Sequence, residues 1–195
     1  GPDLALTSIG TLSVPESGAS GTAGDFNADG LPDLLHCGNG AMGYHAQTAP
    51  GTFADWPVLA YTGVSWPLNI TLAEVNGDDQ LDIVVAALGA VEHFLGDGTT
   101  NFGPRRKPVP LAWTRDITAV DDDADGVDEV FVCFEQTNGG IKRLENTAGT
   151  LTLDQTLITA STTVQYLDKA DVDDNGVAGL IYARNFDDLV GVLYR

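Results

Sequence analysis

The stretch DFNADGLPDLL, from Asp25 to Leu35, decides how this chain folds. Acidic and amide residues occupy its alternate positions, a glycine occupies the sixth position, and an apolar stretch follows. Carboxylates at alternate positions converge when a loop turns sharply at a glycine, and the residues after the turn can then leave as a strand. The stretch therefore predicts an acidic loop that leads directly into a β-strand.

The same pattern returns three times along the chain. Related segments begin at Glu74 (EVNGDDQLDIV), Asp121 (DDDADGVDEVF) and Asp171 (DVDDNGVAGLI), so the four starts lie 49, 47 and 50 residues apart. Each interval holds short extended stretches separated by turn residues, and no window shows a sustained helical period. Four short strands in each interval of about 48 residues are typical of a propeller blade. We expect an all-β fold, a single β-propeller domain of four blades over residues 1–195.

The two ends of the chain indicate how the blades close. After the fourth loop the chain has room for two more strands, and an extended stretch at residues 4–14 precedes the first repeat. We expect this N-terminal strand to complete the last blade, because that pairing removes two exposed sheet edges. Closure is possible in a four-bladed monomer or in a homodimer that exchanges terminal strands, and we favour the monomer.

Each acidic loop offers oxygen ligands at its first, third, fifth and ninth side chains and at its seventh carbonyl. Ca²⁺ takes about six to eight such ligands. The predicted ligands are Asp25, Asn27, Asp29, the Leu31 carbonyl and Asp33 in residues 25–33, and Glu74, Asn76, Asp78, the Gln80 carbonyl and Asp82 in residues 74–82. They continue with Asp121, Asp123, Asp125, the Val127 carbonyl and Glu129 in residues 121–129, and Asp171, Asp173, Asn175 and the Val177 carbonyl in residues 171–179. Gly179 has no side chain to act as the ninth ligand, so the fourth loop is one ligand short. We therefore expect three to four Ca²⁺ ions per chain. The alternative is that the four loops are solvated acidic turns without metal.

Charge excludes several classes of partner. The chain has 28 acidic and 9 basic residues and a formal net charge of −19. Such a surface repels nucleic acids and anionic membranes. No apolar run approaches the roughly 18 residues that a membrane span needs. We therefore expect neither nucleic-acid binding nor membrane insertion.

The four acidic segments resemble FG-GAP/VCBS repeats, which occur in integrin α-subunit propellers, bacterial surface proteins and fungal propeller lectins. The resemblance covers residues 15–195 and rests on the loop D-x-[DN]-x-D-G-x-x-[DE] before an apolar strand. It implies propeller blades with Ca²⁺ held between their first and second strands. The chain departs from the family in having four repeats, where seven or eight blades are common.

Two tryptophans occupy equivalent positions in the repeats. Trp66 and Trp113 each lie eight residues before a loop, on a connection that opens on a propeller face. An exposed indole there would be a platform for a sugar ring, whereas a buried one would pack the junction between blades. Cys37 and Cys133 are also equivalent, and we expect buried free thiols at both positions.

These features favour a calcium-stabilised, extracellular binding module that recognises carbohydrate. Carbohydrate is implied by the resemblance to the lectins, and the location follows from the high Ca²⁺ outside cells, at which such acidic loops fill. The alternatives are a polysaccharide-active, lyase-like enzyme or its appended domain, and a scaffold for protein adhesion. No nucleophile and base are spaced to suggest catalysis, so we do not expect an enzyme.

Overall fold

The computed structural model describes residues 20–38, 40–54, 58–59, 66–99, 101–135, 139–159, 163–174, 176–184 and 189–193. Within these ranges the regular elements are all β-strands, which confirms the predicted all-β fold. The described residues accordingly include no helix long and apolar enough to cross a bilayer.

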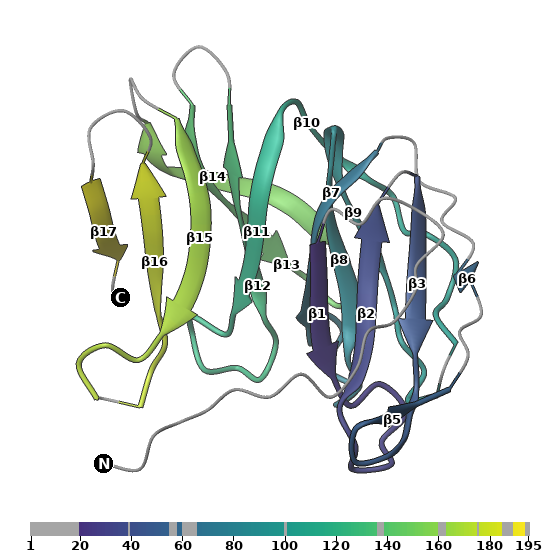
Figure 1. Ribbon diagram of the computed structural model, residues 1–195. Helices are drawn as coiled ribbons and strands as arrows, with labels where there is room; N and C mark the ends of the chain where they lie inside the picture. The colour runs from purple at the N-terminus through teal and green to yellow at the C-terminus, as the bar shows by residue number, and fades with distance from the viewer. Residues whose placement is uncertain are drawn as a thin grey trace.

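The strands form four successive antiparallel sheets and one small hairpin (Figure 1). The first sheet contains β1 (Ser20–Gly24), β2 (Asp33–Gly38), β3 (Ala41–His45) and β6 (Val58–Leu59), and the hairpin is β4 (Gln47–Ala49) with β5 (Thr52–Phe53). The second sheet contains β7 (Pro67–Ala73), β8 (Asp82–Ala87), β9 (Gly89–Phe94) and β10 (Val109–Leu111). The third sheet contains β11 (Thr114–Val120), β12 (Glu129–Phe134), β13 (Gly140–Asn146) and β14 (Leu151–Thr159), and the fourth contains β15 (Val164–Ala170), β16 (Gly179–Arg184) and β17 (Leu189–Leu193).

Each acidic loop joins the first strand of a sheet to its second strand, as the sequence predicts. Residues 25–33 follow β1, residues 74–82 follow β7, residues 121–129 follow β11, and residues 171–179 follow β15. The loops gather at one end of the sheets, the lower end in Figure 1. Because the strand after each loop is apolar, it becomes the centre of its sheet and fixes the loop on a rigid base.

The core fills the three junctions between successive sheets. Successive side chains of a strand point to opposite faces, so each central strand packs one set of residues forward and the other set back. Val84 and Ala86 of β8 pack forward against the third sheet, while Ile83 and Val85 pack back against the first sheet. Burial of one such valine or isoleucine side chain is worth roughly 1.5–3 kcal/mol, so the junctions hold the sheets together.

Both cysteines lie in these junctions as buried free thiols, which confirms their predicted state. Cys37 packs at the first junction and Cys133 at the third. Burial raises the pKa of Cys37 to about 11 and that of Cys133 to about 12. Their small side chains allow neighbouring sheets to approach closely, so this repeated small position serves the contact between sheets.

A chain of hydrogen bonds also ties the first strands of the sheets together. The Ser20 hydroxyl donates to the side-chain oxygen of Asn69, and the Asn69 amide donates to one carboxylate oxygen of Asp116. The other Asp116 oxygen accepts from the Leu167 backbone N–H at 2.8 Å. This series of hydrogen bonds crosses all three junctions near the starts of β1, β7, β11 and β15.

The sheets follow one another in an arc. Strand β1 contacts β7, β7 contacts β11, and β11 contacts β15, whereas no comparable contact joins β15 to β1 in the described residues. Figure 1 shows β1 and β15 apart, with β11 between them in the view. The N-terminal strand predicted at residues 4–14 lies outside the described residues, so closure by that strand stays a prediction.

Candidate metal centre and exposed aromatic face

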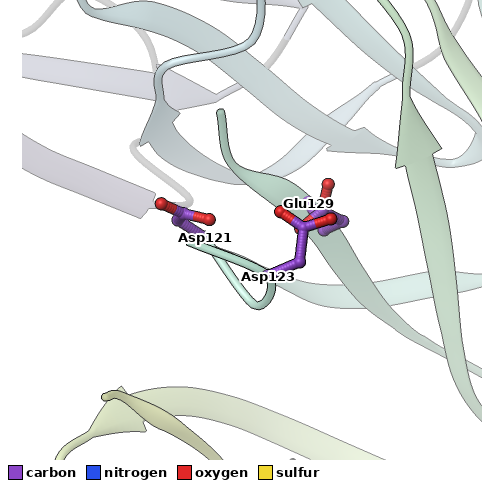
Figure 2. Close-up of side chains that lie close together, drawn as sticks. All are labelled: Asp121, Asp123 and Glu129. Atoms are coloured by element: carbon purple, nitrogen blue, oxygen red, sulfur yellow. The ribbon is translucent and has the colours of Figure 1, made fainter. Parts of the chain in front are cut away.

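The third loop brings three predicted ligands together. Oxygen atoms of Asp121, Asp123 and Glu129 all lie within 4.8 Å of one another. Figure 2 shows the Asp123 and Glu129 carboxylates beside each other, with Asp121 across the turn. Three converging carboxylates repel one another unless a cation lies between them, and hard oxygen donors are the ligands that Ca²⁺ prefers. The residues of this loop therefore fit a divalent cation.

The backbone of the loops explains this convergence. The sixth residue has the left-handed conformation in every loop, with φ of 85° at Gly30, 61° at Asp79, 89° at Gly126 and 86° at Gly176. The fourth residue is left-handed as well, as at Ala124 with φ of 62°. These two left-handed residues, with one residue between them, fold the loop back on itself, so the first carboxylate meets the backbone of the fifth and sixth residues. In the third loop Asp121 accepts from the Asp125 N–H at 3.2 Å and from the Gly126 N–H at 3.0 Å.

The first loop has the same turn with a looser set of acids. Asp25 accepts from the backbone N–H groups of Asp29 at 3.1 Å and of Gly30 at 2.8 Å. The Asn27 amide donates to Asp29 at 3.0 Å, and Asp29 accepts from the Leu31 N–H at 2.9 Å. Among the described residues, the acidic side chains of this loop do not bring three oxygen atoms within 4.8 Å of one another, whereas those of the third loop do.

The ninth residue of the first two loops has a structural role that the sequence did not reveal. Asp33 accepts from Phe26 N–H at 3.2 Å and Gln47 N–H at 2.8 Å. Asp82 likewise accepts from Val75 N–H at 2.9 Å and Gly96 N–H at 2.7 Å. Both side chains are fully buried, and burial raises the pKa of Asp33 and raises that of Asp82 to about 6. Each carboxylate therefore links its loop to the segment that follows the next two strands, which are β2 and β3 for Asp33 and β8 and β9 for Asp82.

The second loop contains an unsatisfied oxygen that suits a cation. Glu74 Oε1 accepts from the N–H groups of Asn76 at 3.0 Å and Gly77 at 2.7 Å, while Glu74 Oε2 is buried and has no hydrogen-bond partner among the described residues. Asp78 accepts from the Gln80 N–H at 2.9 Å. Because a buried anionic oxygen is costly without a partner, the donor set of this loop also fits a metal ion.

The fourth loop is the least complete. Asp171 accepts from the Gly176 N–H at 2.8 Å, and Val177 is 47% exposed. The predicted ligand Asn175 lies outside the described residues. Gly179 begins β16 and has no side chain to offer, so this loop has fewer side-chain ligands than the other three.

Arg143 beside the third loop was not identified from the sequence. It lies on β13, and its guanidinium donates to both oxygens of Asp122 at 2.9 Å. It also lies 3.6 Å from Glu129 and pairs with Glu145 and Asp154. Nothing in the repeat pattern marks this position, because the partners of Arg143 come from the third loop, from β12, from β13 itself and from β14.

The carboxyl group of Glu129 is buried beside Asp122 and Arg143, and these surroundings shift its pKa. Burial, followed by the neighbouring Asp122, raises the pKa of Glu129 to about 7, although Arg143 opposes that shift. The pKa of Arg143 is raised by its hydrogen bond to Asp122. A cation in the loop would add a second positive charge to that of Arg143 and would favour the ionised form of Glu129.

A cavity of about 590 Å³ lies between the third and fourth sheets, next to this cluster. Its polar lining includes Asp122, Asp123, Arg143 and Gln155, and Phe131 contributes an aromatic wall. Polar groups around an aromatic side chain are typical of pockets that bind small polar molecules.

The two predicted indoles are exposed at the other end of the sheets, away from the acidic loops. Trp66 is 60% exposed, Trp113 is 55% exposed, and Leu88 beside them is 44% exposed. The Trp66 carbonyl accepts from the Leu88 N–H at 2.9 Å, and Thr114 next to Trp113 donates to the Ala87 carbonyl at 2.7 Å. These bonds join the chain segments that carry the three exposed apolar residues, which we together call the indole strip. The indoles therefore face solvent in this structure.

Comparison with known proteins supports the repeat and the fold. Residues 25–85 match the sequence profile of the FG-GAP-like repeat. No curated protein sequence matches the chain at a significant level. The chain is similar to a solved lectin from Agrocybe aegerita that recognises non-reducing terminal N-acetylglucosamine, with 16% identity and a TM-score of 0.59, over 84% of this chain and 46% of that one.

A second similar structure is the Tc holotoxin pore of Photorhabdus luminescens, with 20% identity and a TM-score of 0.49, over 87% of this chain and 8% of that one. This chain therefore spans less than half the length of either of these structures. Its residues 25–85 match the FG-GAP-like repeat, within an all-β fold similar to that of the Agrocybe aegerita lectin.

Proposed function

We propose that this chain is a carbohydrate-binding module, built from four propeller blades that Ca²⁺ stabilises. The observation that carries the proposal is the exposure of Trp66 and Trp113 at equivalent positions of neighbouring sheets. An exposed indole presents a flat apolar surface that fits the apolar face of a sugar ring. The similarity to a lectin that recognises N-acetylglucosamine favours binding over catalysis.

The indole strip has polar groups within reach of such a ligand. Arg115 and Glu135 form an exposed ion pair, and the Glu135 backbone N–H donates to the Trp113 carbonyl at 2.7 Å. Sugar hydroxyls both donate and accept hydrogen bonds, so a guanidinium and a carboxylate beside the ring can fix its orientation. Saccharides that end in N-acetylglucosamine are the first ligands to test.

Calcium supports this module from the opposite end of the sheets. The converging carboxylates of Asp121, Asp123 and Glu129 and the unpaired Glu74 oxygen are the groups that favour it. We propose three to four ions per chain, with the fourth loop the weakest. When bound, the ions neutralise the loops, and the carboxylates hold the turns that connect the first and second strands.

An extracellular location follows from this proposal. Loops of this kind are open to solvent, and we expect them to bind Ca²⁺ with micromolar or weaker affinity. Such sites fill at the Ca²⁺ concentration outside cells and stay largely empty in the cytosol. Titration calorimetry with Ca²⁺ tests the location, because nanomolar dissociation constants at every loop would instead indicate a cytosolic buffer.

A glycan array probed with and without chelator tests the function. Binding to a saccharide family, weakened by chelation and lost in Trp66→Ala and Trp113→Ala, is the expected result. Leu153→Ala is the control, because Leu153 is an exposed residue on β14, outside the indole strip. Turnover of a uronic polysaccharide would instead favour a lyase, and the absence of both binding and turnover would favour a protein scaffold.

A further inference from the structure

The three junctions between sheets follow one rule. We call the face of a sheet that contacts the next sheet along the chain its front face, and the opposite face its back face. In the first three sheets, the residues ten and twelve positions after the start of the acidic loop lie on the front face. They are Leu35 and Cys37, Val84 and Ala86, and Phe131 and Cys133. In the second, third and fourth sheets, the residues nine and eleven positions after that start lie on the back face. They are Ile83 and Val85, Val130 and Val132, and Leu180 and Tyr182. At every junction a front face packs against a back face.

The front face of the fourth sheet is apolar but lacks such a partner in the described residues. Ile181 and Ala183 occupy the two rule positions, and each is partly exposed. Across the strand pair they lie opposite Val192 and Val190, which are 37% and 70% exposed. Tyr166, opposite Ala183, is 66% exposed. This cluster corresponds to the faces that are buried in the first three sheets.

The back face of the first sheet is likewise not covered by another sheet among the described residues. Leu34 and His36 hold the rule positions and are partly exposed, and Ala23 of β1 is exposed. With Gly21 they line a shallow groove of about 460 Å³ on this face. The corresponding faces of the next three sheets are covered by the sheet before them.

Side-chain size makes the two uncovered faces complementary. Gly21 stands where Ile70, Ile117 and Leu167 stand in the later sheets, so the first sheet is hollow at that position. Tyr166 stands where the smaller Ser20, Asn69 and Asp116 stand, so the fourth sheet is bulky at the position that faces it. At the internal junctions these two positions meet, since Asp116 accepts a hydrogen bond from the Leu167 N–H. A large residue on one face therefore matches a glycine on the other.

In place of the monomer that the sequence favours, we propose that the front face of the fourth sheet packs against the back face of the first sheet of a second copy of this chain. One chain does not bring these two faces together in the described residues. The first strands of successive sheets contact one another, but β15 of the fourth sheet makes no comparable contact with β1 of the first sheet. Two copies form the contact twice and close a ring. Closure leaves neither apolar face in water, which an open head-to-tail chain would not achieve.

The mass of the protein in solution tests this proposal. Light scattering at low to high micromolar concentration should give about 41 kDa, because two chains of 20.4 kDa associate. Val190→Asp on the front face and Ala23→Glu on the back face should each raise the dissociation constant of the pair at least about tenfold, since each buries an unpaired charge. Leu153→Asp, at an exposed site on neither face, should leave it unchanged.

Circular dichroism should show that both variants keep the β-sheet spectrum, because both substituted residues are exposed in the single chain. A mass of 20.4 kDa at every concentration would overturn the proposal. A mass that grows steadily beyond 41 kDa would contradict closure. A dimer sensitive to only one of the two face variants would show a different interface.

Discussion

Glu74 and Asp128 join the second and third acidic loops through two hydrogen bonds. The Asp128 backbone N–H donates to the Glu74 carbonyl at 2.7 Å, and the Asp128 carboxylate accepts from the Glu74 N–H at 2.8 Å. Glu74 is also the first predicted ligand of its loop. The two loops are therefore coupled mechanically, so that order in one supports order in the other.

Asp128→Ala should destabilise the protein by about 1–2 kcal/mol, because the Glu74 N–H then loses its acceptor. Asp128→Asn is the matched control, since its amide oxygen can still accept that hydrogen bond. Chemical denaturation at fixed Ca²⁺ measures both variants. Equal stability of the alanine variant and the parent would show that the contact between these loops contributes nothing.

Calcium should raise the melting temperature, and the third loop should contribute more than the fourth. A ligand present at about one hundred times its dissociation constant adds about 2.7 kcal/mol per site. Asp123→Asn and Asp173→Asn change the third residue of these two loops in the same way. The shift between EDTA and Ca²⁺ should shrink more in Asp123→Asn than in Asp173→Asn.

The metal-free form gives the control for that comparison. Asp123→Asn should not lower the melting temperature in EDTA, because it removes one of three mutually repelling carboxylates. If chelation leaves the melting temperature of the parent unchanged and elemental analysis finds no bound metal, the calcium proposal is wrong.

Stability should also depend on the protonation of His93. This side chain is buried on β9, and its Nε2 lies 3.1 Å from the Gly149 carbonyl, a contact between the second and third sheets. Burial lowers the pKa of His93 below its usual value of 6.5. As the pH falls through that value the unfolded chain binds a proton before the folded chain does, so the free energy of unfolding decreases.

His93→Gln should remove this contribution while its amide can still donate to Gly149. Thermal melts of parent and variant at pH 7.5 and pH 5.5, at one Ca²⁺ concentration, measure the difference. The parent should lose more stability than the variant between the two pH values. An equal loss would mean that His93 does not titrate differently in the folded and unfolded states.

The repeat pattern was sufficient to predict the local structure. The acidic loops join the first and second strands because the residues that turn the chain and those that extend it are neighbours, as from Gly30 to Leu35. Contacts between sheets were beyond prediction. Asn69 and Asp116 are 47 residues apart, and the ion pairs of Arg143 depend on how strands align. The role of Asp82 was also missed, since a buried acceptor for two backbone N–H groups and a metal ligand look the same in sequence.

The most direct test of carbohydrate binding is a titration of tryptophan fluorescence with saccharides. The panel should include oligosaccharides that end in N-acetylglucosamine, galactose, mannose or fucose, each added to the Ca²⁺-loaded protein. We predict that at least one sugar changes the emission saturably. Titration calorimetry, which does not depend on the indoles as reporters, should show that Trp66→Ala with Trp113→Ala abolishes binding of that sugar, and the melting temperature of this variant should fall by no more than a few degrees. No change in emission with any sugar, in a protein that is folded and loaded with Ca²⁺, would contradict the proposed function.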